Sequence, residues 1–254
     1  MKIIKYTFSF IASIVLLSSF MQPKPTLYII GDSTVRNTGV NQMGWGSCMG
    51  DFLDTTQLQI INRAMAGRST RTFIKEGRWD SVLSMLKAGD YIMMQFGHNE
   101  GSVPDTSKAG YRGVLKGTGE ETKSLVWPDG KPETVHTYGW YLRKFVREAK
   151  AKCAVPIICS MIPRNEFRDG KVLRANNDYG KWASEIAQQE NVFFIDLNKI
   201  TADKYDAMGS DEVKKFFPGD HTHTNEAGAK VNATSVAQGI KELQDCGLRK
   251  YLLK

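Results

Sequence analysis

The sequence predicts an α/β fold built on a doubly wound, five-stranded parallel sheet with helices on both faces. Five short segments are apolar and show no polar face, which is typical of strands that are buried on both sides. Segments with helical periodicity separate them, as in the connections between parallel strands. The expected strands lie within residues 27–35, 58–62, 91–96, 155–161 and 192–197.

Length and composition agree with a single domain that buries a substantial core. The chain has 254 residues, of which 41% are hydrophobic. Its 34 Lys and Arg against 27 Asp and Glu give a formal net charge of +7. This excess forms no dense basic run, so nucleic-acid binding is not indicated. An exported basic protein could meet an acidic polymer, although mild basicity is also common for reasons of solubility.

Residues 1–22 have the pattern of a secretory signal peptide. Lys2 and Lys5 precede an apolar block from Phe8 to Phe20, which is too short to span a bilayer comfortably. We therefore expect a secreted or periplasmic protein whose residues 23–254 form one domain without membrane insertion. The alternative is an uncleaved N-terminal anchor, because no small-x-small cleavage site follows the block.

Between the expected strands, the sequence predicts helices and one long polar segment. The helices are expected at 48–53, 79–86, 138–152, 176–190 and 229–243. Residues 101–133 are polar and rich in Gly, Ser, Thr and Lys. A loop of this length in a compact domain is usually functional or mobile.

Ser33 follows the first strand at a point that suits a nucleophile. The apolar run that begins at Leu27 ends in Gly-Asp-Ser-Thr, where Gly31 permits a sharp turn. We expect Ser33 in the first turn of a following helix, where unpaired N–H groups and the helix dipole favour developing negative charge. The alternative is that Ser33 or Asp32 is only a helix N-cap.

Two further candidate residues follow strand ends. Gly67 comes after the second strand and Asn99 after the third. Ligands of doubly wound sheets bind outside the carboxyl ends of the strands, so we expect Ser33, Gly67 and Asn99 to meet at one edge. The N–H groups of Ser33 and Gly67 and the side-chain amide of Asn99 are candidate donors of an oxyanion hole.

A serine nucleophile needs a base, and the base needs a group that holds its tautomer. His223 lies three residues after Asp220 in a turn before the last helix, a spacing at which a carboxylate reaches the imidazole Nδ1–H. We therefore expect Ser33, His223 and Asp220 to form a catalytic triad. Asp220, His221 and His223 could instead ligate a metal, but a fourth ligand at a suitable spacing is not evident.

These motifs resemble those of a known hydrolase superfamily. GDST at 31–34, Gly67, GHN at 97–99 and DxxH at 220–223 are similar, in order, to the blocks of the SGNH (GDSL-type) hydrolases. Within this superfamily, the chain resembles the rhamnogalacturonan acetylesterase branch in three segments, NRAMAGRSTRTF, DYIMMQFGHNE and DHTHTNEAGA. The resemblance implies a three-layer flavodoxin-like fold, hydrolysis of acetyl esters on pectin without metal or cofactor, and the triad and oxyanion hole named above. Glu100 departs from the branch, which more often has Asp there.

Candidate substrate contacts are Arg68, Arg71 and Trp45. The two arginines lie at the expected active-site end of the sheet, where they could bind the carboxylates of rhamnogalacturonan or could be ordinary salt-bridged arginines. Trp45 could stack on a sugar ring. Trp127 in the long polar segment could do the same, with packing inside its own loop as an equal alternative.

We therefore expect a serine esterase that removes acetyl groups from a plant polysaccharide through an acyl-enzyme. A second hypothesis is a lipase-like or thioesterase enzyme acting on a lipid, or an esterase acting on acetylxylan. A third is a non-catalytic sugar-binding domain, which the presence of all five catalytic positions disfavours. The sequence does not fix the oligomeric state. Its four cysteines show no CxxC spacing, and export would permit disulfides without requiring them.

Overall fold

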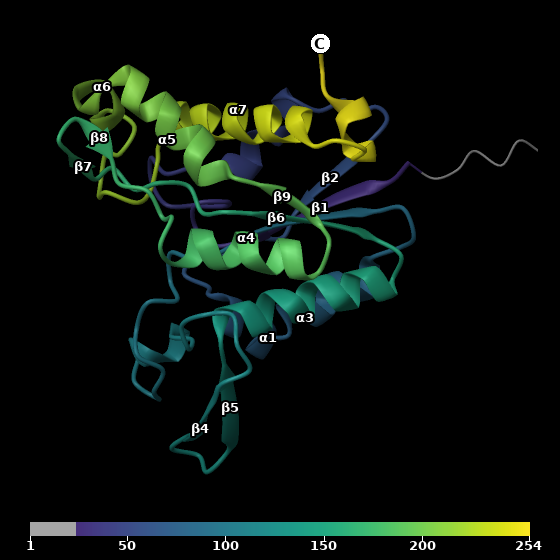
Figure 1. The fold of residues 1–254 in the computed structure, drawn as a ribbon, viewed down its shortest axis with the longest axis vertical. Helices are drawn as coiled ribbons and strands as arrows, with labels where there is room; N and C mark the ends of the chain where they lie inside the picture. The colour runs from purple at the N-terminus through teal and green to yellow at the C-terminus, as the bar shows by residue number, and fades with distance from the viewer. Residues whose placement is uncertain (1–23) are drawn as a thin grey trace, which may run out of the picture.

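A parallel five-stranded sheet forms the centre of the fold. The computed structural model describes residues 24–254, so the expected signal peptide lies outside the described residues. The strands are β1 (Thr26–Gly31), β2 (Gln59–Asn62), β3 (Tyr91–Gln95), β6 (Val155–Cys159) and β9 (Phe193–Ile195). Their spatial order is β2-β1-β3-β6-β9, and every neighbouring pair is parallel (Figure 1). This flavodoxin-like order confirms the predicted fold class.

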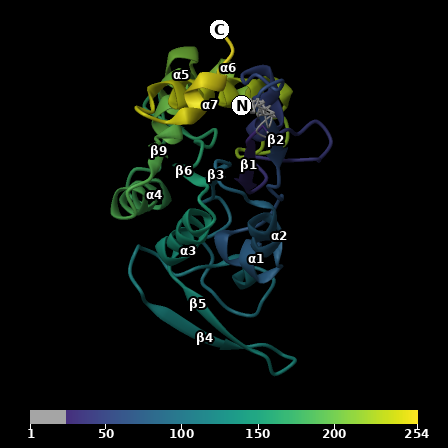
Figure 2. The same cartoon turned by 90° about the vertical axis from the view of Figure 1, so that its right-hand side faces the viewer.

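Helices cover the two faces of the sheet in separate layers (Figures 1 and 2). The helices of one face are α1 (Thr70–Lys75), α2 (Arg78–Met85), α3 (Tyr138–Ala151) and α4 (Tyr179–Gln189). The other face packs against α7 (Glu226–Glu242) and the short 3-10 helices η1 (Trp45–Asp51) and η3 (Gly247–Tyr251). Two hydrophobic cores therefore lie on opposite sides of one sheet.

Side chains of β1 alternate between these two cores. Leu27 and Ile29 belong to the core with α7, whereas Tyr28 and Ile30 belong to the core with α1 to α4. All four are buried, because successive side chains of a strand point to opposite faces. This explains why the strand has no polar face in the sequence.

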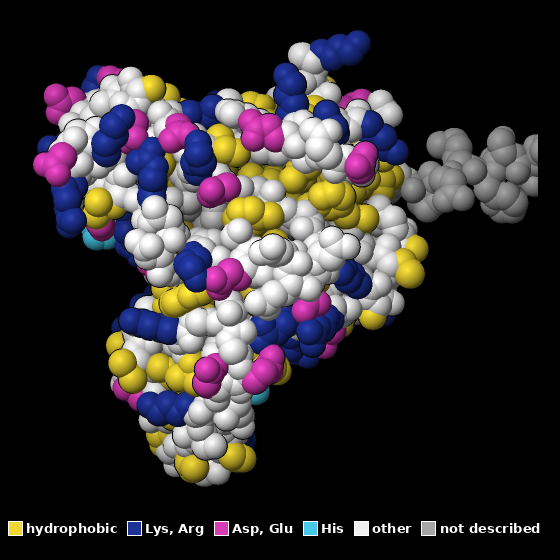
Figure 3. Space-filling view, in the orientation of Figure 1, with side chains coloured by type: hydrophobic (Ala, Val, Ile, Leu, Met, Phe, Trp, Pro, Cys, Tyr) yellow, Lys and Arg dark blue, Asp and Glu magenta, His cyan; other side chains and the backbone are white. Residues whose placement is uncertain are grey.

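A smaller lobe lies beside α7 on the same side of the sheet. It contains α5 (Leu197–Met208), α6 (Ser210–Lys214) and a short hairpin of β7 (Phe167–Arg168) and β8 (Lys171–Val172). Its small core includes Tyr205 and Phe217. Figure 3 shows the outline of the molecule indented below this lobe, on the side where the strands have their carboxyl ends in Figure 1.

The long polar segment is more ordered than the sequence predicts. It contains the 3-10 helix η2 (Gly110–Arg112) and the strand β4 (Thr122–Val126), which pairs in antiparallel register with β5 (Pro132–His136). This β4–β5 hairpin projects below α1 and α3 (Figures 1 and 2). The expectation of a loop at 101–133 is therefore wrong where η2, β4 and the start of β5 form.

The turn after β1 also differs from the expectation. No helix begins at Ser33: the chain makes a single turn, in which the N–H groups of Val35 and Arg36 donate to the Asp32 carbonyl, and this turn is not continued. The Asp32 carboxylate accepts the N–H of Thr34 at 2.9 Å, which closes an Asx turn instead of capping a helix. At Gly31 any Cβ would lie 2.4 Å from the Gln95 carbonyl oxygen, so the close approach of β3 requires glycine.

Two properties of the described residues bear on the sequence-based hypotheses. Between residues 24 and 254, no helix is both long enough and apolar enough to cross a membrane. The four cysteines all fall in this range and form no disulfide; Cys48, Cys159 and Cys246 are buried, and Cys153 is exposed.

Candidate active site

Ser33, His223 and Asp220 are joined by hydrogen bonds, although the serine and the histidine are 190 positions apart. His223 Nε2 lies 2.8 Å from Ser33 Oγ, and His223 Nδ1 lies 2.6 Å from Asp220 Oδ2. Because an ionised carboxylate only accepts, Nδ1 donates to Asp220 and Nε2 is left to accept the serine proton. This is the geometry of a Ser–His–Asp triad.

Asp220 is held in its ionised form by its own loop. Its Oδ1 accepts the N–H of Thr222 at 2.6 Å and the N–H of His223 at 2.8 Å. Burial raises the pKa of Asp220, but hydrogen bonds from the His223 side chain and from these two backbone groups outweigh it and lower the pKa to about 2. The carboxylate is therefore available to stabilise an imidazolium.

The three expected oxyanion donors lie on the turns that follow β1, β2 and β3. In the part of the chain that the structure describes, the N–H groups of Ser33 and Gly67 donate to no backbone carbonyl. Gly67 has a φ of 76°, and a Cβ built on it would meet open space. Asn99 Nδ2 donates one proton to the Arg68 carbonyl at 3.1 Å and keeps a second for another acceptor.

Arg112 fixes the orientation of the Asn99 amide. Its Nη1 donates to Asn99 Oδ1 at 2.9 Å. A guanidinium only donates, so this contact directs the amide oxygen toward Arg112 and leaves Nδ2 for Arg68 and the site. The sequence contains no signal for this role, because Arg112 lies 13 positions away from Asn99 inside the polar segment.

Glu100 connects two of the active-site turns. Its Oε1 accepts the N–H of Thr70 and its Oε2 accepts the N–H of Asn99, each at 2.9 Å. The side chain is fully buried. Burial and, next, the charge of Asp32 raise the pKa of Glu100 to about 8, against the lowering effect of its backbone hydrogen bonds. The residue that departs from the branch at this position thus accepts two backbone N–H groups.

The sequence that carries this site matches a known protein family. The model of the GDSL-like lipase/acylhydrolase family matches residues 29–231, a range that contains Ser33, Gly67, Asn99, Asp220 and His223. The chain belongs to the GDSL-like lipase/acylhydrolase family. The chain is 34% identical to the rhamnogalacturonan acetylesterase of Emericella nidulans over 85% of this chain and 84% of that one. It is 33% identical to the probable rhamnogalacturonan acetylesterase YesY of Bacillus subtilis, over 85% of this chain and 93% of the relative.

Solved structures give the same result for the fold. The YxiM protein of Bacillus subtilis superposes with a TM-score of 0.71 at 25% identity, covering 88% of this chain and only 58% of that one. An acetyl-xylooligosaccharide esterase from Geobacillus superposes with a TM-score of 0.55 at 17% identity, covering 87% and 95% of the two chains. The activity follows from the family and from the named relatives, which make the chain a carboxylic ester hydrolase.

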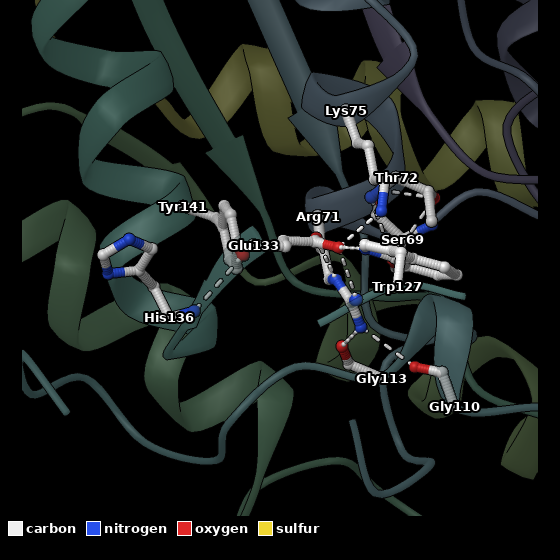
Figure 4. A network of polar contacts seen from close by, with 10 residues as sticks. All are labelled: Ser69, Arg71, Thr72, Lys75, Gly110, Gly113, Trp127, Glu133, His136 and Tyr141. Atoms are coloured by element: carbon white, nitrogen blue, oxygen red, sulfur yellow. Dashed lines mark hydrogen bonds and ion pairs between the residues drawn. The ribbon is translucent and has the colours of Figure 1, made fainter. Parts of the chain in front are cut away.

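Two of the three expected substrate contacts are wrong. Trp45 is fully buried in the core with α7, and its Nε1 donates to Gln95 Oε1 at 2.8 Å. Arg71 is also buried, and its guanidinium is occupied by Glu133 and by the carbonyls of Gly110 and Gly113 (Figure 4). Both side chains hold the fold together and have no surface left for a sugar.

The third expected substrate contact, Arg68, remains accessible to solvent. Its side chain is 32% exposed and donates from Nε to Glu76 Oε2 at 2.9 Å. A second arginine, Arg164, lies against the loop of the triad, where its Nη1 is 2.9 Å from His221 Nε2 and 2.5 Å from Thr222 Oγ1. Since His221 contacts Arg164, its ring does not meet Asp220 and His223 at a common metal position.

Among residues 24–254, no three His, Cys, Asp or Glu side chains form a metal-binding cluster.

Proposed function

We propose that this family member is a serine esterase that removes acetyl groups from acetylated rhamnogalacturonan through an acyl-enzyme. The hydrogen-bonded series Ser33–His223–Asp220 carries the proposal. The substrate class is supported by the names of the two relatives at 34% and 33% identity.

In the acylation step, His223 Nε2 takes the proton of Ser33 as Oγ attacks the acetyl carbonyl carbon. The oxyanion that forms is bound by the N–H groups of Ser33 and Gly67 and by Asn99 Nδ2. Collapse of this intermediate breaks the bond between the carbonyl carbon and the sugar oxygen. His223 then gives its proton to that oxygen, and the deacetylated sugar leaves with a free hydroxyl.

In the deacylation step, water repeats the attack. His223 takes a proton from the water as its oxygen adds to the acetyl carbon, and the same donors bind the second oxyanion. Breaking the bond to Ser33 Oγ releases acetic acid, and the histidine proton returns to the serine. Asp220 stays ionised throughout and stabilises each imidazolium, as its pKa of about 2 permits.

Charge near the site supports an acidic polymer. The rhamnogalacturonan backbone carries a carboxylate on every second sugar, whereas the backbone of acetylated xylan is neutral. Arg68 is accessible and is one residue from Gly67. A partly desolvated contact between this arginine and a uronate would exceed the value of an exposed ion pair, which is about 0.2–1 kcal/mol.

The test measures acetate release from acetylated rhamnogalacturonan and from acetylated xylan, with p-nitrophenyl acetate as a small reference ester. We expect the first polymer to be preferred, the preference to weaken with added salt, and Arg68→Ala to reduce it by a few-fold. Arg78→Ala is a matched control, because Arg78 pairs with the same Glu76 at 2.6 Å and has a similar exposed fraction of 29%. Equal rates on both polymers, insensitive to salt and to Arg68→Ala, would leave an esterase and remove the pectin assignment.

Export is a separate part of the proposal. It rests on the two lysines and the apolar block within residues 1–22. Expression of the full chain in a bacterial host, followed by N-terminal sequencing of the secreted or periplasmic fraction, should show a start near residue 23. Recovery of the intact chain in the membrane fraction would indicate the uncleaved anchor instead.

A further inference from the structure

A cavity of about 710 Å³ lies between the β4–β5 hairpin and the helices α1 and α3. It is separate from the triad, since none of Ser33, Asp220 and His223 lines it. Aromatic side chains make up much of its wall: Tyr111, Trp127, His136, Trp140 and Tyr141. Figure 4 shows three of these residues around the buried Arg71.

The rings are arranged as flat, partly exposed surfaces. His136 and Trp140 are stacked with ring centroids 3.7 Å apart and an angle of 8° between their planes. Trp127 meets Tyr111 edge to face at 5.7 Å. His136, Trp140, Trp127 and Tyr111 each keep an accessible portion. A flat aromatic face contacts the C–H face of a pyranose ring well, and such walls with a few polar groups are typical of ligand sites.

An internal polar network holds the wall in place. Arg71 binds Glu133 through two hydrogen bonds, at 2.7 and 3.0 Å, and Trp127 Nε1 donates to the same carboxylate at 2.6 Å (Figure 4). Lys75 also pairs with Glu133, and its Nζ lies 3.4 Å from the centroid of the Trp127 ring. The rings are therefore preorganised, which reduces the entropy that a ligand must lose on binding.

The cavity is connected to the proposed oxyanion hole through η2. Tyr111 lines the cavity, and the next residue, Arg112, donates to Asn99 Oδ1. Consecutive Cα atoms are about 3.8 Å apart. Arg71 fixes the position of η2, because its Nη1 donates to the carbonyls of Gly110 and Gly113 at the two ends of this helix. The wall of the cavity is thus linked, through consecutive residues of η2, to a side chain that contacts Asn99.

The charges of the wall favour an anionic ligand slightly. The buried Arg71 neutralises Glu133, which leaves the basic residues Lys75 and Lys131 against the acidic residue Asp129. Lys131 pairs with Asp129 at 2.7 Å, but its side chain is 80% exposed and is free to exchange that partner for a ligand carboxylate. The single excess positive charge lies next to aromatic rings.

We propose that this cavity is a second carbohydrate-binding site, which holds a uronic-acid-containing part of the polysaccharide away from the sugar whose acetyl group is removed. The site binds a sugar unit by stacking on the His136–Trp140 pair, with a uronate near Lys131. The inference rests on the proposed function for the nature of the polymer, but its binding can be measured without catalysis.

The direct test uses Ser33→Ala protein and a deacetylated rhamnogalacturonan fragment as the probe, titrated by calorimetry. We expect saturable binding that weakens about tenfold when Trp140→Ala is added and recovers with Trp140→Phe, which keeps an aromatic face. Phe52→Ala is the matched control: it also removes a partly buried aromatic ring, but one that packs on the core with α7. Absence of binding, or equal weakening by Phe52→Ala, overturns the proposal.

A kinetic test separates this proposal from the proposed function. In otherwise unchanged enzyme, Trp140→Ala should lower kcat/KM for acetylated rhamnogalacturonan about tenfold more than kcat/KM for p-nitrophenyl acetate, mostly through KM. Equal effects on the two substrates contradict a second binding site even if the enzyme is a rhamnogalacturonan acetylesterase. Binding of the fragment without any release of acetate from the polymer would instead defeat the proposed function and leave the carbohydrate site in place.

Discussion

Arg112 should be a positioning residue for the oxyanion hole, and Arg112→Met tests this directly. The variant keeps an unbranched side chain in place of the aliphatic stem of arginine but removes the guanidinium donor that lies 2.9 Å from Asn99 Oδ1. A hydrogen bond with one charged partner contributes about 1.5–3 kcal/mol. Without it, the amide can rotate and place its oxygen toward the developing oxyanion, where only Nδ2 is useful.

The expected loss is smaller than that of the donor itself. Removing one oxyanion donor costs about 10²- to 10³-fold in kcat, so Asn99→Ala sets the upper limit. We expect Arg112→Met to lower kcat for p-nitrophenyl acetate by about 10- to 100-fold, which corresponds to about 1.4–2.8 kcal/mol of barrier. KM should change little, because the lost interaction is made mainly in the transition state.

A double substitution distinguishes positioning from a general structural effect. If Arg112 acts through Asn99, Arg112→Met should add almost nothing in an Asn99→Ala background, because the amide that it orients is gone. A loss below twofold in the single variant would refute the reasoning. So would a full additional loss in the Asn99→Ala background, and a melting curve of each variant shows whether the protein is folded in the assay.

Three other outcomes are expected. His223→Ala should lower kcat by several orders of magnitude and His221→Ala much less, because only His223 contacts Ser33; the reverse order in an ester assay would show that the wrong base has been assigned. Trp45→Phe should lower the free energy of unfolding in urea by about 1–3 kcal/mol, because Gln95 Oε1 loses its hydrogen-bond donor. The kcat of the folded enzyme should stay near wild type. A change in substrate KM without a change in stability would restore a substrate role for Trp45. Hydrogen bonds from Arg71, Lys75 and Trp127 outweigh burial and lower the pKa of Glu133 from 4.5 to about 2, so the stability from this carboxylate is complete above pH 4.5 and is lost as the pH falls toward 2. Thermal unfolding should therefore depend less steeply on pH in this window for Glu133→Gln than for wild type, and equal slopes would contradict the assignment.

Much of the site could be predicted because a parallel sheet brings strand ends together. The strands β1, β3 and β6 are buried on both faces, so their apolar segments and their ends are visible in the sequence. This placed Ser33, Gly67 and Asn99 on adjacent turns, and the three-residue spacing of Asp220 and His223 added the remaining pair. The order β2-β1-β3 then puts the turns of β1 and β3 next to each other.

Features that depend on distant partners could not be predicted. Arg71 finds Glu133 62 positions away and Trp45 finds Gln95 50 positions away, so neither burial is visible locally. Short elements were missed for a different reason. The helix α1 has six residues, fewer than two turns, and too few to show an apolar stripe.

The β4–β5 hairpin was missed because its apolar signal is weak. One residue in each strand is buried, Leu125 in β4 and Val135 in β5, and both strands otherwise face solvent or the cavity. A period of two cannot be recognised from one buried residue per strand. The same exposure leaves its inner side free to form the wall of the carbohydrate site.

Glu100 has a consequence for how this family can vary. One carboxylate accepts an N–H from the start of α1, three residues after Gly67, and another from Asn99. The length of the Glu100 side chain thereby sets the distance between the N–H groups of Thr70 and Asn99, which lie on turns after different strands. Aspartate at this position is one methylene shorter and would have to draw the two turns inward to keep both contacts. Residue 100 therefore acts as a spacer for the acyl pocket, and a change of its length should be inherited together with compensating changes in the turns that it joins.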